Sequence, residues 1–123
     1  MTAGEPPLLT PSEVVLQLSE LGRSLDAAVR TLREAELDMV SKRHAADLAE
    51  SMAFVRAEGS MDLRKHLARI EAAPLEKEAL VAEAVCRYLK TQIRALELRV
   101  EIGRSYGAAV RAELAALPYD PQP

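Results

Sequence analysis

Apolar residues recur at alternating spacings of three and four along most of the chain, which is typical of helices that bury one stripe. In the N-terminal half this stripe runs through Leu18, Leu21, Leu25, Ala28, Leu32, Ala35 and Met39. Beyond Met39 the larger apolar side chains change phase, and the stripe is better placed through Val40, His44, Leu48, Met52 and Val55. The pattern predicts one long helix with a stutter, a phase shift that coiled coils absorb.

Signals for helix ends flank this stripe. Thr10 can cap a helix, Pro11 stands where its missing N–H does no harm, and Glu13 completes a capping box. Gly59 suits the left-handed conformation that ends a helix, and Ser60 can cap the segment that follows. The first helix is therefore predicted over residues 11–58.

The C-terminal half is predicted to hold two helices, because Pro74 disfavours helical geometry at Ala73. A short helix would cover residues 61–72 and a long one residues 74–117, ahead of Pro118. The stripe of the long helix runs through Ala82, Val85, Leu89, Ile93, Leu96, Val100, Gly103, Gly107, Val110, Leu114 and Leu117. We expect an all-α fold: an antiparallel coiled-coil-like hairpin of two long helices with a short intervening helix. Residues 1–10 are predicted as a disordered leader and 118–123 as a tail.

One phrase is nearly repeated, as "ELGRSLDAAVR" at residues 20–30 and "EIGRSYGAAVR" at 101–111. Folding the long helices back at residues 59–62 would place Gly22 opposite Gly103, with Ala28 and Gly107 nearby. Glycine within a helix costs about 1 kcal/mol relative to alanine, so close helix packing would explain its presence. We predict a pseudo-symmetric packing contact at these four residues, and no phosphate loop, because such a loop needs free backbone N–H groups.

Further apolar residues lie outside the main stripe and predict a second face that needs cover. They are Val14, Leu37, Val81, Leu98 and Ile102. Self-association into a bundle of four or more helices would bury this face, so we expect a homo-oligomer.

Composition supports a helical protein without an active site. Of 123 residues, 49% are hydrophobic but only 3% aromatic, and the net charge is −3. The single cysteine, Cys86, excludes an intramolecular disulfide, and neither a membrane span nor a signal peptide is evident, so we expect a cytoplasmic protein. His44, His66 and Cys86 lack the spacing of metal ligands, and paired carboxylates lack an apolar pocket, so we predict no metal, no cofactor and no catalytic residue.

Basic residues offer two interpretations. Arg87, Lys90 and Arg94 form one stripe on the last helix, whereas Arg64, Lys65 and Arg69 lie near the turn. With Lys42, Arg43 and Arg56 they would make one end of the hairpin positive, although Glu50, Glu58 and Glu83 dilute that charge. These residues are either a solvated helix face or a surface for nucleic acid or a protein partner.

The segments "AFVRAEGSMDLRKHLA" and "LKTQIRALELRVEIGRSYGAAVRAEL" resemble a group of small helical proteins of tailed bacteriophages and prophages. The matching positions are Gly59 and Ser60, the basic pair Arg64 and Lys65, and Arg104 with Ser105. The resemblance implies a phage protein encoded among genes of DNA replication and recombination. We therefore expect a non-enzymatic binding or scaffolding module; the alternatives are direct nucleic-acid binding through the basic end and inhibition of a host protein.

Overall fold

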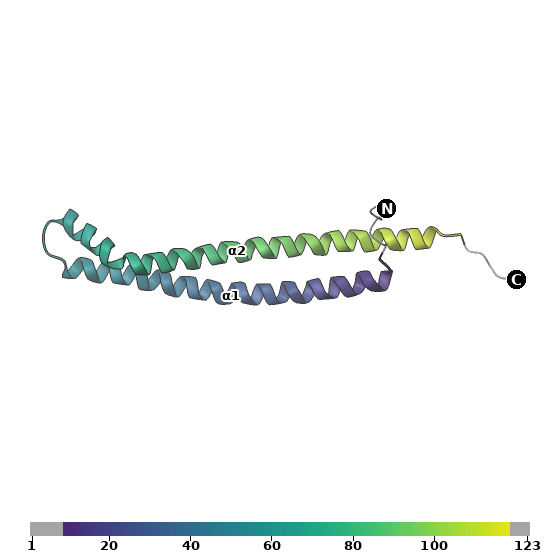
Figure 1. The fold of residues 1–123 in the computed structure, drawn as a ribbon, viewed down its shortest axis with the longest axis horizontal. Coiled ribbons are helices and arrows are strands. Elements are labelled where there is room, and N and C mark those ends of the chain that lie inside the picture. The colour runs from purple at the N-terminus through teal and green to yellow at the C-terminus, as the bar shows by residue number, and fades with distance from the viewer. Residues whose placement is uncertain (1–8, 119–123) are drawn as a thin grey trace, which may run out of the picture. The chain divides into compact units, whose positions relative to one another are not determined.

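The computed structural model describes residues 9–118, and within this range the chain is all-α, as predicted. It consists of α1 (Pro11–Arg56) and α2 (Met61–Ala116), without a strand in the described residues (Figure 1). The described chain divides into two compact units: unit 1 comprises residues 9–27 and 93–118, and unit 2 comprises residues 28–92. Most of the predicted leader and tail, residues 1–8 and 119–123, lies outside the described range.

The start of α1 has the predicted capping box. Thr10 Oγ1 accepts a hydrogen bond from the backbone N–H of Glu13 at 3.2 Å, and a Glu13 carboxylate oxygen accepts one from the N–H of Thr10 at 2.9 Å. Two N–H groups at the helix start, where no intrahelical acceptor is available, are thus satisfied. The sequence signal for this boundary is confirmed.

The turn between the helices lies in unit 2 and also follows its sequence signals. Gly59 has a φ of 117°, a conformation that L side chains rarely adopt. Ser60 Oγ accepts a hydrogen bond from the N–H of Leu63 at 3.2 Å and so caps α2. Arg64 adds a contact that was not predicted: its guanidinium donates to the carbonyl of Phe54 and lies 4.3 Å from the centre of the Phe54 ring. A carbonyl in the last turn of α1 is thereby satisfied by α2.

Helix α2 is not divided at Pro74, so the prediction of a separate short helix over residues 61–72 is wrong. Residues 61–116 form one helix that contains Pro74. Proline cannot donate a hydrogen bond to the carbonyl four residues earlier, and its ring crowds that carbonyl, which bends a helix without necessarily ending it. Accordingly, the first turns of α2 run at an angle to those that follow (Figure 1).

Alanine dominates the contact between α1 and α2 in unit 2. The buried residues there are Ala46, Ala53, Ala68, Ala72, Ala79, Ala82 and Cys86, and no large side chain of the described residues is fully buried. On α1 the half-buried Lys42 and Ala49 continue the alternation of three and four between Met39 and Ala53, and on α2 the half-buried Leu75 and Leu89 continue it beyond Ala72. We call these buried and half-buried positions the seam; because the helices meet through short side chains, they can approach closely.

The seam overturns two details of the predicted stripe. The predicted change of phase after Met39 is absent, because Val40, Leu48, Met52 and Val55 are all exposed. On α2 the seam passes through Cys86, whereas the neighbouring Val85 is 45% exposed. In both places we predicted burial of the larger apolar side chain, and the structure buries a smaller one nearby.

In unit 1 the seam follows the predicted stripe more closely. Leu18, Leu21 and Leu25 of α1 and Leu96, Val100 and Val110 of α2 are half-buried, and Ile93 is buried. Val14, which was expected on a second face, is instead buried at 5% exposure. The other four residues of that face, Leu37, Val81, Leu98 and Ile102, are exposed as expected.

Candidate functional site

Two of the four predicted packing residues lie at close helix contacts in unit 1. A Cβ atom built on Gly103 would lie 2.8 Å from Leu18 Cδ2, and one built on Gly107 would lie 3.0 Å from Val14 Cγ1. Both distances are shorter than ordinary carbon–carbon contacts of about 3.5–4.0 Å. The two glycines therefore receive side chains of α1 that larger residues would displace.

Gly22 does not take part in such a contact, contrary to the predicted pairing with Gly103. A Cβ atom on Gly22 would have no neighbour within 4 Å. The residue that reaches Gly103 is Leu18, one helical turn earlier, so the repeated phrases are not paired glycine to glycine. Ala28 is half-buried and belongs to unit 2.

An apolar groove borders Gly103 in unit 1. It has a volume of about 350 Å³ and contains Leu18, Leu21 and Ile102 in its lining, with Gln17 and Arg99 as its polar members. Tyr106 also lines it, and its hydroxyl oxygen accepts a hydrogen bond from the N–H of Leu9 at 3.1 Å. Gly103 is part of the lining and contributes no side chain to it.

The basic residues proposed as a contact surface are not gathered in one place. Arg64 is engaged with Phe54, as described, and Arg69 lies 3.9 Å from a Glu50 carboxylate oxygen. Eighteen residues of helix, or about 27 Å, separate Arg69 from Arg87. Within residues 9–118, no ion pair engages the exposed side chains of the remaining candidates, which are Lys65, Arg87, Lys90 and Arg94.

The other basic residues expected at the hairpin end are neutralised by carboxylates. Lys42 pairs with Asp38 at 3.0 Å, and Arg56 pairs with Glu71 at 2.8 Å. Residues 28–92 contain eleven acidic and eleven basic residues, so unit 2 carries no formal net charge. Carboxylates therefore balance the basic residues of this unit.

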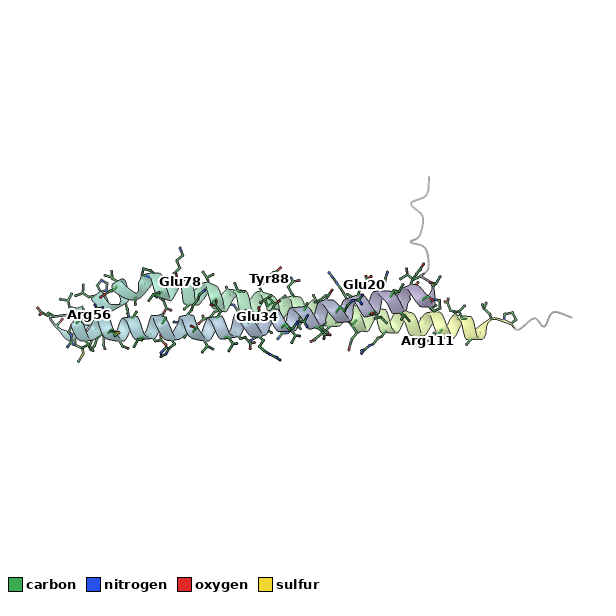
Figure 2. The ribbon with its side chains drawn as sticks, turned by 90° about the horizontal axis from the view of Figure 1, so that it is seen from below. Glu20, Glu34, Arg56, Glu78, Tyr88 and Arg111 are labelled. Carbon is green, nitrogen blue, oxygen red and sulfur yellow. The ribbon has the colours of Figure 1, made fainter. Side chains whose placement is uncertain are left out.

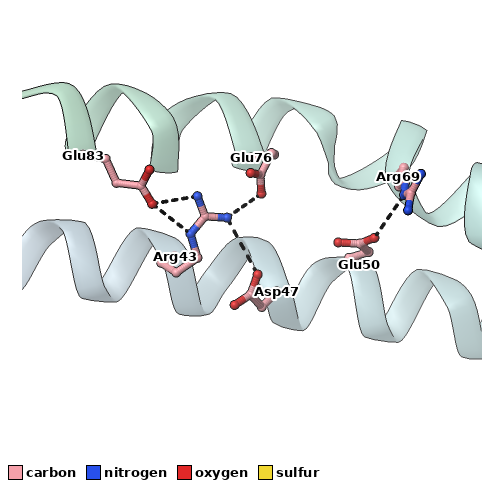
Figure 3. A network of polar contacts seen from close by, with 6 residues as sticks. All are labelled: Arg43, Asp47, Glu50, Arg69, Glu76 and Glu83. Carbon is pink, nitrogen blue, oxygen red and sulfur yellow. Dashed lines mark hydrogen bonds and ion pairs between the residues drawn. The ribbon is translucent and has the colours of Figure 1, made fainter.

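Arg43 is the centre of a polar network that sequence reasoning missed (Figure 3). Its guanidinium lies 2.8 Å from Glu83, 2.7 Å from Glu76 and 3.8 Å from Asp47, measured between charged nitrogen and oxygen atoms. Hydrogen bonds to Glu83 and then to Glu76 raise the pKa of Arg43 above its ordinary value. The signal in the sequence was positional: Arg43, Glu76 and Glu83 each follow a seam residue directly, which is where coiled coils place interhelical ion pairs.

Large apolar side chains are abundant on the surface of unit 2. Those that are at least 40% exposed include Val40, Leu48, Met52, Val55, Leu67, Ile70, Leu80, Val81, Val85 and Tyr88. Exposed apolar residues are normal when scattered, but a contiguous set indicates an interaction surface. Unit 2 thus buries its alanines and exposes residues that would ordinarily form a core.

Potential ligands for a metal ion are not clustered: residues 9–118 hold no group of three or more histidine, cysteine, aspartate or glutamate side chains arranged for this purpose. His44 and His66 are exposed, whereas Cys86 is buried, as its expected packing role requires. Neither described helix has a stretch that is both long and apolar enough to cross a lipid bilayer. Comparison with known proteins gave no match to a family model, to a curated protein or to a solved structure.

Proposed function

We propose that this chain is a non-enzymatic helical interaction module that self-associates into a bundle and acts as a scaffold or binding partner for other proteins. The observation that carries the proposal is the inverted distribution of apolar side chains in unit 2. Its seam is built from alanines, while leucine, valine, methionine and tyrosine side chains remain exposed. Burying a large apolar side chain contributes about 1.5–3 kcal/mol, so association is the main source of stabilisation still open to this unit.

The pattern of charge also favours association of proteins over binding of nucleic acid. Phosphate binding requires unpaired basic groups in one region, and unit 2 is neutral with most of its basic side chains near the turn engaged. Direct contact with nucleic acid would depend on Arg87, Lys90 and Arg94, which lie on one helix. This leaves nucleic-acid binding as the weaker alternative.

The cellular setting follows from the resemblance alone. We propose a cytoplasmic phage protein that supports DNA replication or recombination, or that inhibits a host protein, through the same helical surfaces. Each of these roles needs an accessible protein-binding face and none needs a catalytic group. They differ in the partner, which affinity capture from phage-infected cells can distinguish.

Sedimentation equilibrium over a wide range of protein concentration tests the proposal. We expect a discrete oligomer whose mass does not change when a short single-stranded oligonucleotide is added. A monomer at every concentration would refute self-association. The oligonucleotide could instead co-sediment with the protein. If added salt weakens that binding and charge reversal at Arg87 and Lys90 abolishes it, nucleic-acid binding replaces the scaffold proposal.

A further inference from the structure

The two sides of unit 2 that flank the seam differ in character. One side is defined by residues that directly follow a seam residue: Arg43 and Glu50 on α1, and Arg69, Glu76 and Glu83 on α2. They join the helices through the contacts between Arg43 and both glutamates and between Arg69 and Glu50 (Figure 3). We call this the polar side; its charged groups already satisfy one another across the hairpin.

The opposite side is predominantly apolar, and its charged members include Glu71 and Glu78, which directly precede the seam residues Ala72 and Ala79. Met52 and Val85 directly precede the seam residues Ala53 and Cys86, so they flank the seam on the side away from Arg43. Helical periodicity places five more apolar residues on this side, slightly farther from the seam. The apolar side consists of Leu48, Met52, Val55, Leu67, Val81, Val85 and Tyr88, which are between 42% and 74% exposed. Figure 2 shows Tyr88 on the edge of α2 that faces away from α1.

A groove on the apolar side could accept side chains of another molecule. It has a volume of about 360 Å³, and Ala53, Ala57, Leu67 and Ile70 form its apolar lining. Its charged members, Arg56 and Glu71, pair with each other at 2.8 Å. The small alanine side chains that border the groove leave room for it, and its two charged groups already pair with each other.

The extent of the apolar side matches what a stable dimer requires. Seven side chains that are about half exposed present on the order of 500 Å² of apolar surface. Protein interfaces are about 60% apolar, so this corresponds to about 800 Å² buried on each partner, the size of a standard specific interface. Unit 2 carries no formal net charge, so the net charge of this unit does not oppose its pairing with unit 2 of a second copy.

We propose that the apolar side of unit 2 is the surface on which a second copy of this chain docks, in an isologous contact between two hairpins. The inference rests on the proposed self-association and specifies the face that mediates it. In the dimer, apolar side chains of each copy enter the groove beside Ala53 of the other, and the Arg43 networks remain on the outer, solvated sides. The bundle is therefore closed through one face of the hairpin only.

The test compares two double variants that carry the same change of charge. Met52→Glu with Val85→Glu modifies the apolar side at one position on each helix. Val40→Glu with Leu80→Glu is the matched control, because both residues are exposed apolar positions that directly follow seam residues on the polar side. The dissociation constant of each protein is measured by sedimentation equilibrium, and circular dichroism verifies that helicity is retained.

We expect the apolar-side variant to dissociate at least about 100-fold more readily than the unmodified protein, because four carboxylates would enter each dimer interface. The polar-side control should remain within about threefold of the unmodified protein. If the unmodified protein associates and both variants raise its dissociation constant equally, the assignment of the face is overturned, whereas self-association stands. A monomeric unmodified protein would refute both the face and the proposed function.

Discussion

Replacement of Gly103 by leucine tests whether the close contact with Leu18 is a structural requirement. A Cβ atom at this position would lie 2.8 Å from Leu18 Cδ2, so Leu18 would have to move. The matched control is Gly22→Leu, because a Cβ atom on Gly22 would meet nothing within 4 Å. Both substitutions replace a helical glycine by leucine. They differ mainly in whether a side chain of the other helix lies close to the new residue.

The two variants should change stability in opposite directions. Leucine favours the helix over glycine by roughly 0.8 kcal/mol, which is the expected gain in free energy of unfolding for Gly22→Leu. Overpacking at a close contact costs about 1–3 kcal/mol, so Gly103→Leu should lose roughly 1 kcal/mol after the same gain is counted. The difference of about 2 kcal/mol corresponds to a separation in Tm of roughly 8 °C for a chain of this size.

Thermal unfolding followed by circular dichroism, at one protein concentration, measures both values. A further variant separates the contact with Leu18 from a general disturbance of the helix. Leu18→Ala removes the obstructing side chain, so Gly103→Leu combined with Leu18→Ala should be more stable than the sum of the single changes by at least about 1 kcal/mol. Equal shifts for the two leucine variants, or strict additivity in the double variant, would refute the packing argument.

Three further substitutions probe the turn, the bend and the polar network. Gly59→Ala should lower the free energy of unfolding by about 1–3 kcal/mol because of the positive φ, as measured by urea titration. Pro74→Ala should raise it by about 2 kcal/mol by restoring a backbone hydrogen bond, unless the bend is itself required, in which case the same titration would show a loss. Arg43→Met should lower Tm at neutral pH; since acid protonates the carboxylates that Arg43 binds, this difference should shrink as the pH falls, and a difference independent of pH would contradict the ion-pair explanation.

The helix boundaries could be predicted because their signals are local. Thr10 with Glu13, and Gly59 with Ser60, act through hydrogen bonds and backbone geometry within a few residues. The effect of Pro74 was misjudged. Proline destabilises the helix only locally, and the helix on both sides of Pro74 is long enough to continue through it. The loss of one hydrogen bond bends α2, and tertiary packing keeps the helix continuous.

The side of each helix that is buried was harder to predict, since two stripes compete in unit 2. Hydrophobicity favoured Val40, Leu48 and Met52, but strict alternation of three and four from Met39 leads to Lys42, Ala46, Ala49 and Ala53. The helical periodicity identified the buried positions correctly, whereas the size of the apolar side chains did not. The apolar side and the Arg43 network both depend on the seam, so neither could be located from the sequence until the seam was known.

An alanine seam has a consequence for the alignment of the two helices. Short side chains interlock weakly, so within unit 2 a slip of one helix along the other by a whole heptad, about 10 Å, would change apolar burial little. The charges on the polar side oppose this slip. The charged residues that recur at intervals of seven along this side of α2 are Asp62, Arg69, Glu76, Glu83 and Lys90.

Slippage in either direction would disrupt this order of charges. Arg43 lies between Glu76 and Glu83, and one heptad of slip would replace one of these partners by Arg69 or Lys90. Glu50, now near Arg69, would face Asp62 or Glu76. In Arg43→Met, spin labels on the two helices of unit 2 should therefore report a second distance population displaced by one heptad; a single population would show that the alignment does not require the ion pairs of Arg43.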